Sequence, residues 1–159
     1  MNQFFKNKKV LVTGGAGFIG TNLILKLLEE GAKVRATIHK KSPQIENSKV
    51  EFVKVDLTKE SDCKKAVQGI DYVFMCAANT SGAAVIENSP LSHVTPNVIM
   101  NTLMLDAAYK AGVKKFLFIS SNTFYPLTDF PVKEADVSYE FYEKYFPVGW
   151  MKLFTEKLC

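Results

Sequence analysis

The chain has 159 residues, 47% of them hydrophobic and 23% charged, with a formal net charge of +4. A chain of this length buries roughly 68–70% of its unfolded surface, which allows a hydrophobic core and excludes a disordered protein. No apolar run reaches the about 18 residues of a membrane span, and the N-terminus lacks a signal peptide's apolar segment. The mild, scattered charge predicts no nucleic-acid partner and no membrane.

The three cysteines Cys63, Cys76 and Cys159 have no metal-ligand spacing, and their odd number argues against a disulfide framework. We therefore expect no metal and a cytoplasmic protein. Cys76 ends an apolar strand pattern and is interpreted as a small core residue. His93, in a polar stretch before Pro96, is assigned to a loop with no ligand role.

Short apolar runs alternate with helical patterns along the chain. Strands are expected at 9–13, 33–38, 50–55, 71–76 and 115–120, and helices at 18–30, 59–67, 97–110 and from 148 onward. The first helix shows the signal most clearly, because Ile19, Leu23 and Leu27 share one stripe and Gly31 stops the pattern.

This alternation predicts a parallel sheet, because parallel strands need crossover connections. We expect an α/β fold of the Rossmann-like, doubly wound type, with helices on both faces of the sheet in three α/β/α layers. Such folds usually have six strands, and the pattern shows five. The helical pattern at the C-terminus also has no cap. Residues 1–159 are therefore predicted to be one domain, the N-terminal part of a longer enzyme.

The first strand and the first helix are joined by a glycine-rich turn. Gly14 permits the tight turn, Gly17 lets the backbone approach a pyrophosphate, and Gly20 lets the helix pack closely on the sheet. N–H groups at the helix start and the positive end of its dipole then hold the anion. The strand and helix flanks give the motif its meaning. The alternative is a glycine-rich turn with no ligand.

Several segments together resemble one family. The family is that of the extended short-chain dehydrogenase/reductases. Its glycine turn is similar to residues 10–20, and its adenine-contacting strand end to residues 53–58. Its fourth strand is similar to residues 71–78, and its serine-bearing strand to residues 116–126. Within that family, the segments are especially similar to nucleotide-sugar epimerases and dehydratases of the GDP-fucose synthase and UDP-glucose 4-epimerase types. The resemblance covers essentially the whole chain and implies an NAD(P)-binding Rossmann domain.

The end of the second strand indicates which dinucleotide is preferred. An NAD site usually has an acid about 20 residues past the glycines, but no acid occurs between Glu30 and Glu46. His39 and Lys40 follow the strand instead, and cations attract a 2′-phosphate. We therefore expect NADP(H), with His39 and Lys40 as contacts. A solvated basic loop, with NAD as the cofactor, is the alternative.

Asp56 has two interpretations of equal weight: a carboxylate that accepts from the adenine amino group, or a residue that organises the turn before the next helix. The resemblance implies further cofactor contacts at a set of positions. These are Phe18, Ile19, Leu57, Ala77, Ala78 and Lys152.

In the resembled family a Ser, a Tyr and a Lys cooperate in acid–base catalysis. By resemblance Ser121 is the catalytic serine, Lys152 the catalytic lysine, and Thr123 a contact to the sugar of the substrate. A hydroxyl that only closes a strand-end turn is the alternative for Ser121. The tyrosine position, four residues before the lysine, holds Val148, which has no ionisable proton.

Three explanations of Val148 stay open. The first is that Tyr145 or Tyr142 takes the tyrosine's place, although Pro147 is expected to break the helix between Tyr145 and Val148. The second is that another acid serves, either Glu143 or one from the missing half of the protein. The third is that the protein binds its cofactor without turnover.

The sequence thus favours an NAD(P)-dependent epimerase, dehydratase or reductase that acts by hydride transfer on a nucleotide sugar, as a homodimer when full length. The alternative is a non-catalytic dinucleotide-binding sensor or regulatory protein of the same fold.

Overall fold

The computed structural model describes residues 4–80 and 82–159. The chain divides into two compact units. The sheet unit comprises the described residues up to Ala78 together with Met100–Ile119, and the second unit comprises the described residues of Asn79–Ile99 and Ser120–Cys159.

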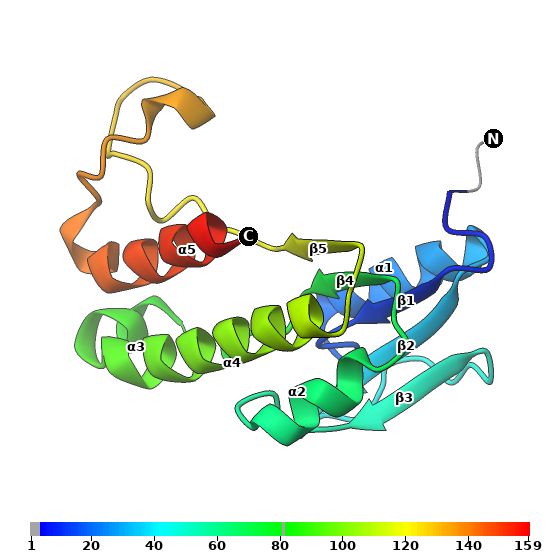
Figure 1. Cartoon of the computed structure of the whole chain (residues 1–159). Coiled ribbons are helices and arrows are strands. Elements are labelled where there is room, and N and C mark those ends of the chain that lie inside the picture. The colour runs from blue at the N-terminus through cyan, green and yellow to red at the C-terminus, as the bar shows by residue number, and fades with distance from the viewer. Residues whose placement is uncertain (1–3, 81) are drawn as a thin grey trace. The chain divides into compact units, whose positions relative to one another are not determined.

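The sheet unit is built on five parallel strands (Figure 1). They are β1 (Lys9–Val12), β2 (Lys33–Ile38), β3 (Val50–Lys54), β4 (Tyr72–Met75) and β5 (Lys115–Phe118), in the order β3-β2-β1-β4-β5. Val10 of β1 pairs with Val34 of β2 on one side and with Tyr72 of β4 on the other. The strand order therefore reverses between β1 and β4. In open α/β sheets, ligands bind at such a reversal, beyond the carboxyl ends of the strands.

Helices cover both faces of this sheet, which confirms the predicted three-layer Rossmann-like fold. On one face, α1 (Phe18–Glu29) packs Ile24 and Leu27 into a cluster with strand residues such as Val34. On the other, α2 (Glu60–Val67) and the C-terminal half of α4 (Pro90–Lys110) form a second cluster with Leu11. β1 contributes to both clusters because Val10 and Val12 face α1 while Leu11 faces the opposite side.

The second unit contains helical and irregular segments. They are α3 (Ala83–Asn88), the N-terminal half of α4, the short 3₁₀ turns Glu134–Asp136 and Glu143–Tyr145, and α5 (Phe146–Leu158). Its small core contains Phe124, Phe141 and Leu153, all buried. The loop that follows β5 is thereby fixed to α5.

The α4 helix begins seven residues before its predicted start, so the assignment of His93 to a loop is wrong. His93 lies inside the helix, 7% exposed, and Pro96 lies in the helix interior. Proline at 96 has no N–H for the Ser92 carbonyl. That carbonyl instead accepts a hydrogen bond from the Asn79 side chain at 3.1 Å. The helix continues through Pro96 because another residue replaces the missing donor.

The expected break at Pro147 is also absent. Pro147 lies in the first turn of α5, where proline is well tolerated because its missing N–H has no intrahelical partner. Tyr145 lies just outside the helix, at the N-cap position. The helix therefore begins before Val148, and Tyr145 and Val148 do not share a helical face.

Candidate functional site

The glycine turn lies at the carboxyl end of β1 and leads directly into α1. Gly14 has a φ of +69°, and a side-chain carbon there would lie 2.8 Å from the Cα of Ala77. A side-chain carbon at Gly17 would lie 3.2 Å from the Gly14 carbonyl oxygen and, apart from its own neighbours in the chain, would meet no other described atom within 4 Å. Gly14 is therefore required by the fold, whereas Gly17 leaves the backbone open to an approaching molecule.

The turn is held to the end of β2 by hydrogen bonds. The Gly15 N–H donates to the Thr37 carbonyl at 2.8 Å, and the Gly14 N–H donates to the Thr37 hydroxyl at 3.2 Å. From α1, the Thr21 hydroxyl donates to the Gly15 carbonyl at 3.1 Å. These contacts fix the backbone of the turn without a ligand, so a bound anion would not have to order it.

Thr13 links the turn to the end of β4. Its fully buried hydroxyl accepts a hydrogen bond from the Ala77 N–H at 2.9 Å and lies 3.3 Å from the Met75 sulfur. The backbone of Ala77 thus lies against Gly14. Ala78, which is exposed, is the next residue along the chain.

The amino end of α1 is suited to an anion. The first intrahelical acceptor is Gly17, which receives the Thr21 N–H, so the N–H groups of Phe18, Ile19 and Gly20 have no acceptor within the helix. The first turn contains no acidic residue. The helix dipole therefore acts there without a competing negative charge. Phe18 is 86% exposed and Ile19 48% exposed.

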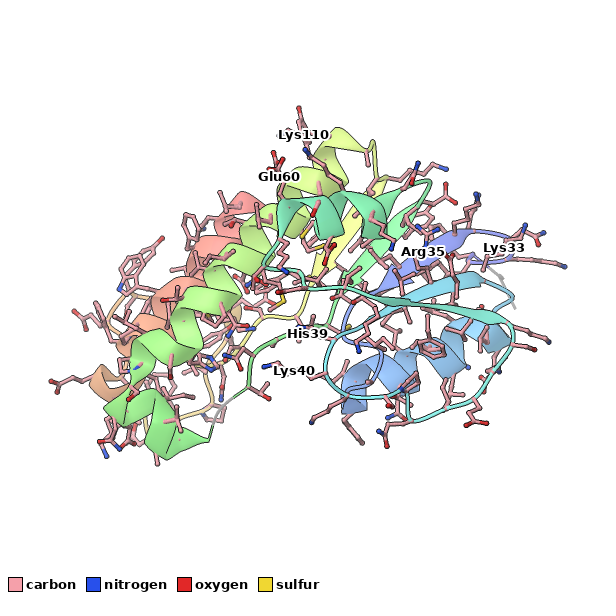
Figure 2. All side chains as sticks on the ribbon, turned by 90° about the horizontal axis from the view of Figure 1, so that it is seen from below. Lys33, Arg35, His39, Lys40, Glu60 and Lys110 are labelled. Carbon is pink, nitrogen blue, oxygen red and sulfur yellow. The ribbon has the colours of Figure 1, made fainter. Side chains whose placement is uncertain are left out.

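His39 and Lys40 follow β2 and are both exposed. Figure 2 shows them near the carboxyl end of β2, away from Lys33 at its amino end. Arg35 is not part of this group. Its Nη1 donates to the carbonyls of Ala66 and Gln68 at the end of α2.

Asp56 organises the turn after β3, as one of its two interpretations predicted. Its Oδ1 accepts hydrogen bonds from the Thr58 hydroxyl at 2.6 Å and from the Thr58 N–H at 3.1 Å. These bonds are the main reason that the pKa of Asp56 lies below its usual value, and the charge of His39 adds a smaller effect. The adenine contact stays a prediction. The Leu57 side chain belongs to the sheet unit's core, so only its backbone can reach a cofactor.

Ser121 and Thr123, in the second unit, are hydrogen-bonded to each other. The Thr123 N–H donates to Ser121 Oγ at 3.2 Å, and the two hydroxyl oxygens are 3.1 Å apart. α5 packs on the same turn through Gly149, where a side-chain carbon would lie 2.8 Å from the Thr123 carbonyl oxygen. Ser121 thus occupies a turn fixed from two sides.

Lys152 and Val148 both lie on α5. Val148 is 3% exposed and therefore packs in the interior. Lys152 is half-buried, and burial lowers the pKa of its ammonium group. Tyr145, at the N-cap, has its ring against that of Tyr142, with centroids 5.6 Å apart. Glu143 is exposed.

His93 has a lowered pKa, first because it is buried and then because of the charge of Lys152. Its Nδ1 has no hydrogen-bond partner among the described residues, and neither has the hydroxyl of Ser120. The backbone carbonyl of His93 accepts from the Asn97 side chain at 2.8 Å. Asn97 also bonds both backbone polar groups of Asn79, at 2.8 and 2.9 Å.

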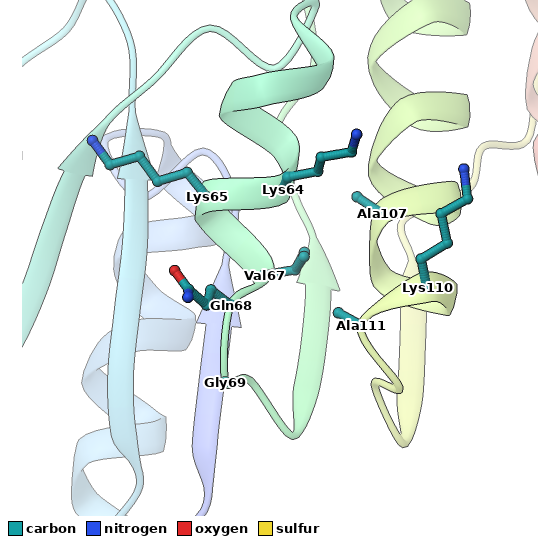
Figure 3. A pocket seen from close by; sticks show the side chains of 8 residues that line it. All are labelled: Lys64, Lys65, Val67, Gln68, Gly69, Ala107, Lys110 and Ala111. Carbon is teal, nitrogen blue, oxygen red and sulfur yellow. The ribbon is translucent and has the colours of Figure 1, made fainter.

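One open groove of about 580 Å³ lies in the sheet unit, away from the glycine turn (Figure 3). It is lined by the C-terminal ends of α2 and α4, and Gly69 lies near the Lys9 ammonium at the amino end of β1. Its Lys64 pairs with Glu60 and its Lys110 with Asp106. Cations are favourable at helix C-termini, so these lysines need no ligand to explain them.

No three His, Cys, Asp or Glu side chains of the described residues gather as a metal site would require. Within the same residues, no helix has the length and apolar character needed to cross a membrane.

Sequence analysis missed the polar residues that hold the site together. Thr13 and Thr37 end or nearly end their strands and face inward, which strand periodicity alone does not reveal. The role of Asn97 was missed because Pro96 suggested that the helix starts only at residue 97. An asparagine directly after a proline, at helical spacing from Met100 and Met104, is the signal that could have found it.

Comparisons with known proteins show which sequences this chain resembles. The sequence model of the NAD dependent epimerase/dehydratase family matches residues 10–159. GDP-mannose 3,5-epimerase of Arabidopsis thaliana is 32% identical to this chain. The alignment covers 97% of this chain and 42% of that protein. 3-beta-hydroxysteroid dehydrogenase of Mycolicibacterium neoaurum is 38% identical over 118 residues, which cover 72% of this chain and 32% of that protein.

Two solved structures have the same fold. Epimerase Mth375 of Methanothermobacter thermautotrophicus has a TM-score of 0.84 and 30% identity, covering 98% of this chain and 47% of that one. UDP-glucose 4-epimerase of Bifidobacterium longum, solved with NAD+ and UDP, has a TM-score of 0.80 and 29% identity, covering 95% of this chain and 48% of that one. The chain therefore spans less than half the length of these proteins.

Proposed function

Because the chain belongs to the NAD dependent epimerase/dehydratase family, we propose that it is the cofactor-binding part of an enzyme that acts on a nucleotide sugar. The single observation that carries this proposal is the pre-formed glycine turn at the amino end of α1, where the space a Gly17 side chain would fill stays open. When bound, a nicotinamide dinucleotide would accept or deliver a hydride. The chain itself has to hold the diphosphate and orient the reacting oxygen.

The diphosphate would be held by backbone N–H groups at the start of α1, beside Gly17 and Gly20. The turn that leads to these donors is fixed before binding, because the N–H groups of Gly14 and Gly15 donate to Thr37. Support for this role comes from the solved epimerase with NAD+ and UDP, since its fold matches this chain at a TM-score of 0.80. The exposed Ile19 and Phe18 and the backbones of Leu57, Ala77 and Ala78 are proposed to complete the surface around the cofactor.

For the dinucleotide itself we favour NADP(H). His39 and Lys40 are exposed beyond β2, and Arg35 is engaged elsewhere, so these two residues are the proposed partners of a 2′-phosphate. His39→Asp would add a carboxylate that repels the 2′-phosphate, and it should shift the binding preference from NADPH to NADH. A wild-type protein that binds NADH as tightly as NADPH would contradict the proposed preference.

Two residues are proposed to act on the sugar. Ser121 would donate a hydrogen bond to the reacting oxygen, and Lys152 would place a positive charge near it, which stabilises negative charge that develops in the transition state. Thr123 was expected to contact the sugar directly. Neither role moves the proton that the sugar hydroxyl loses with the hydride. In the enzyme proposal that proton goes to Tyr145, Tyr142 or Glu143, in place of the tyrosine absent at Val148.

Val148 favours a second candidate function, a protein that binds dinucleotide and performs no catalysis. The valine is buried at 3% exposure and carries no proton to exchange. A proton-transfer group typically contributes about 10²–10⁴-fold in rate. Its loss without replacement would therefore leave a binding protein with little activity.

Turnover assays of the intact protein distinguish the two candidates. UDP-, GDP- and dTDP-sugars are tested with each dinucleotide, together with a steroid alcohol, because one relative is a 3-beta-hydroxysteroid dehydrogenase. The enzyme proposal predicts conversion of a nucleotide sugar, with activity falling at least about 10²-fold in Ser121→Ala. Conversion of the steroid alcohol alone would overturn the nucleotide-sugar proposal. Saturable dinucleotide binding without conversion of any of these substrates would establish the second candidate instead.

A further inference from the structure

We propose that Thr123 is a positioning residue, which orients the Ser121 hydroxyl so that its proton points away from the turn as a hydrogen-bond donor. This inference rests on the proposed function in one respect, that the oriented proton serves a reacting oxygen. It changes the role of Thr123 expected from sequence, which was direct contact with the sugar.

A serine hydroxyl has one proton to donate and two lone pairs that accept hydrogen bonds. The Thr123 N–H can only donate, and it lies 3.2 Å from Ser121 Oγ. The Thr123 hydroxyl lies 3.1 Å from the same oxygen. When the threonine hydroxyl donates, both lone pairs of Ser121 are used, and its own proton must find an acceptor outside the pair.

The backbone of Thr123 is fixed, so this orientation is built into the turn. The Tyr125 N–H donates to the Asn122 carbonyl at 3.1 Å, which closes the turn around Thr123. On the other side, α5 approaches so closely at Gly149 that a side-chain carbon there would be 2.8 Å from the Thr123 carbonyl oxygen. Thr123 is half-buried, and its carbonyl packs against α5 at Gly149.

The neighbouring serine shows the contrast. Ser120 Oγ is buried and has no partner among the described residues, so no neighbour orients its proton. Ser121 Oγ instead has the Thr123 N–H and the Thr123 hydroxyl within hydrogen-bond distance, at 3.2 and 3.1 Å. A donor held in place before reaction stabilises a developing oxyanion more than a rotating hydroxyl does, because no reorganisation is needed when charge forms.

A pair of threonine variants tests the role in turnover. Thr123→Val keeps the shape and removes the hydroxyl, and Thr123→Ser keeps the hydroxyl. If Thr123 acts through Ser121, kcat falls about tenfold or more in Thr123→Val with little change in KM, and Thr123→Ser restores most of it. A rise in KM with an unchanged kcat would instead show direct sugar binding and overturn the proposal.

A double-variant cycle sharpens this test. In the Ser121→Ala background, Thr123→Val should have no further effect on kcat, because the hydroxyl that it orients is gone. Ser120→Ala is the matched control, and Thr123→Val should keep its full effect there. Independent effects of Thr123→Val and Ser121→Ala on kcat would contradict the proposal.

Neutron diffraction of the perdeuterated chain tests the orientation without any turnover. The expected density places the Thr123 hydroxyl deuteron between the two oxygens and the Ser121 deuteron outside the pair. A Ser121 deuteron between the two oxygens would overturn the inference even if the enzyme proposal holds. Conversely, the expected neutron density in a protein that converts no substrate would support the inference about Thr123 while the proposed function fails.

Discussion

Gly17 and Gly20 belong to one sequence motif, yet the structure gives them different physical roles. A side-chain carbon at Gly20 would collide with the Gly14 carbonyl oxygen and lie 3.1 Å from the Cα of Gly15, so the fold itself needs this glycine. A side-chain carbon at Gly17 would enter the open space beside the turn. Substitution of Gly20 is therefore expected to harm folding, whereas substitution of Gly17 is expected to harm anion binding.

His93 makes the stability of the chain sensitive to acid. Its pKa is lowered in the folded state by burial and by Lys152, from an ordinary value of 6.5. The unfolded chain therefore binds more protons in the window just below pH 6.5, and the free energy of unfolding falls as the pH drops through it. His93→Gln should reduce this loss when thermal unfolding is followed from pH 7.5 to about pH 5.

His39 provides the matched control, because it is the other of the two histidines and is exposed. His39→Gln should keep the acid-dependent loss of stability. An unchanged pH dependence in His93→Gln would show that the imidazole is not held neutral by its surroundings.

Among single residues, the glycines of the turn and the cations after β2 could be named as candidates from sequence. Glycine and charged residues are recognisable by their type alone. It could not identify Thr13, whose role depends on Ala77, 64 residues away in the chain. The adenine contact of Asp56 and the 2′-phosphate contact of His39 stay predictions, since they concern a ligand.

Among the elements, α5 depends on one close approach. Gly149→Ala would normally favour a helix by roughly 0.5–1 kcal/mol. Here the added methyl would lie 2.8 Å from the Thr123 carbonyl oxygen and 3.0 Å from the Phe141 ring. Overpacking typically costs about 1–3 kcal/mol, so the clash should outweigh the helix preference.

Urea unfolding measures this balance. Gly149→Ala should lower the free energy of unfolding by up to about 2.5 kcal/mol, the largest difference between the two effects. Lys157→Ala, at an exposed position of the same helix, should change it by less than about 0.5 kcal/mol. A more stable Gly149→Ala protein would mean that α5 does not pack closely on the Thr123 turn.

Arg35 joins three elements of the sheet unit. From β2, its Nε donates to the Glu51 carboxylate of β3 at 2.9 Å, and its Nη1 donates to two carbonyls at the end of α2 at 2.9 and 3.1 Å. Its side chain is only 20% exposed. Arg35→Met should therefore lower the free energy of unfolding by about 1–3 kcal/mol, because the carbonyls lose a charged donor.

Arg35→Lys should recover only part of this loss in the same urea experiment, since one ammonium group cannot reproduce the planar fork of a guanidinium. Equal stability of Arg35→Met and the wild type would refute the role of Arg35 as a link between these elements.

The elements themselves were largely predictable. β2 has its predicted bounds, and the other strands differ by one or two residues at their ends. The start of α4 was missed because proline normally ends a helix, and only the donation from Asn79 to the Ser92 carbonyl explains its continuation. α3 has six residues, too few to show a periodicity, and was not predicted.

At the scale of the molecule, the sheet ends at β5, which pairs only with β4 in the described structure. Leu117 on this edge strand is 45% exposed. An exposed apolar edge favours strand pairing with another chain. We therefore predict that the 159-residue chain associates with rising concentration in sedimentation velocity.

Leu117→Lys should reduce that association, because an edge lysine opposes strand pairing. A wild-type chain that stays monomeric and unfolds cooperatively would contradict the prediction. The homodimer expected for the whole protein stays a separate prediction, and it should survive the Leu117→Lys change.

The chain spans less than half the length of its relatives, so the substrate pocket of the whole protein stays a proposal. Cofactor binding is the part of the account that this chain can test by itself. The glycine turn, the start of α1 and the cations after β2 all lie within the sheet unit. The central claim is that these three features together, and no single residue, bind the dinucleotide.

Calorimetric titration of the chain with NADPH and with NADH tests that claim most directly. We predict saturable binding that is tighter for NADPH, that is lost or strongly weakened in Gly17→Val, and that is unchanged in Lys65→Ala, a lysine of the groove at the end of α2. Absence of binding for both dinucleotides, or equal binding by wild type and Gly17→Val, would contradict the claim that the amino end of α1 holds a dinucleotide's diphosphate.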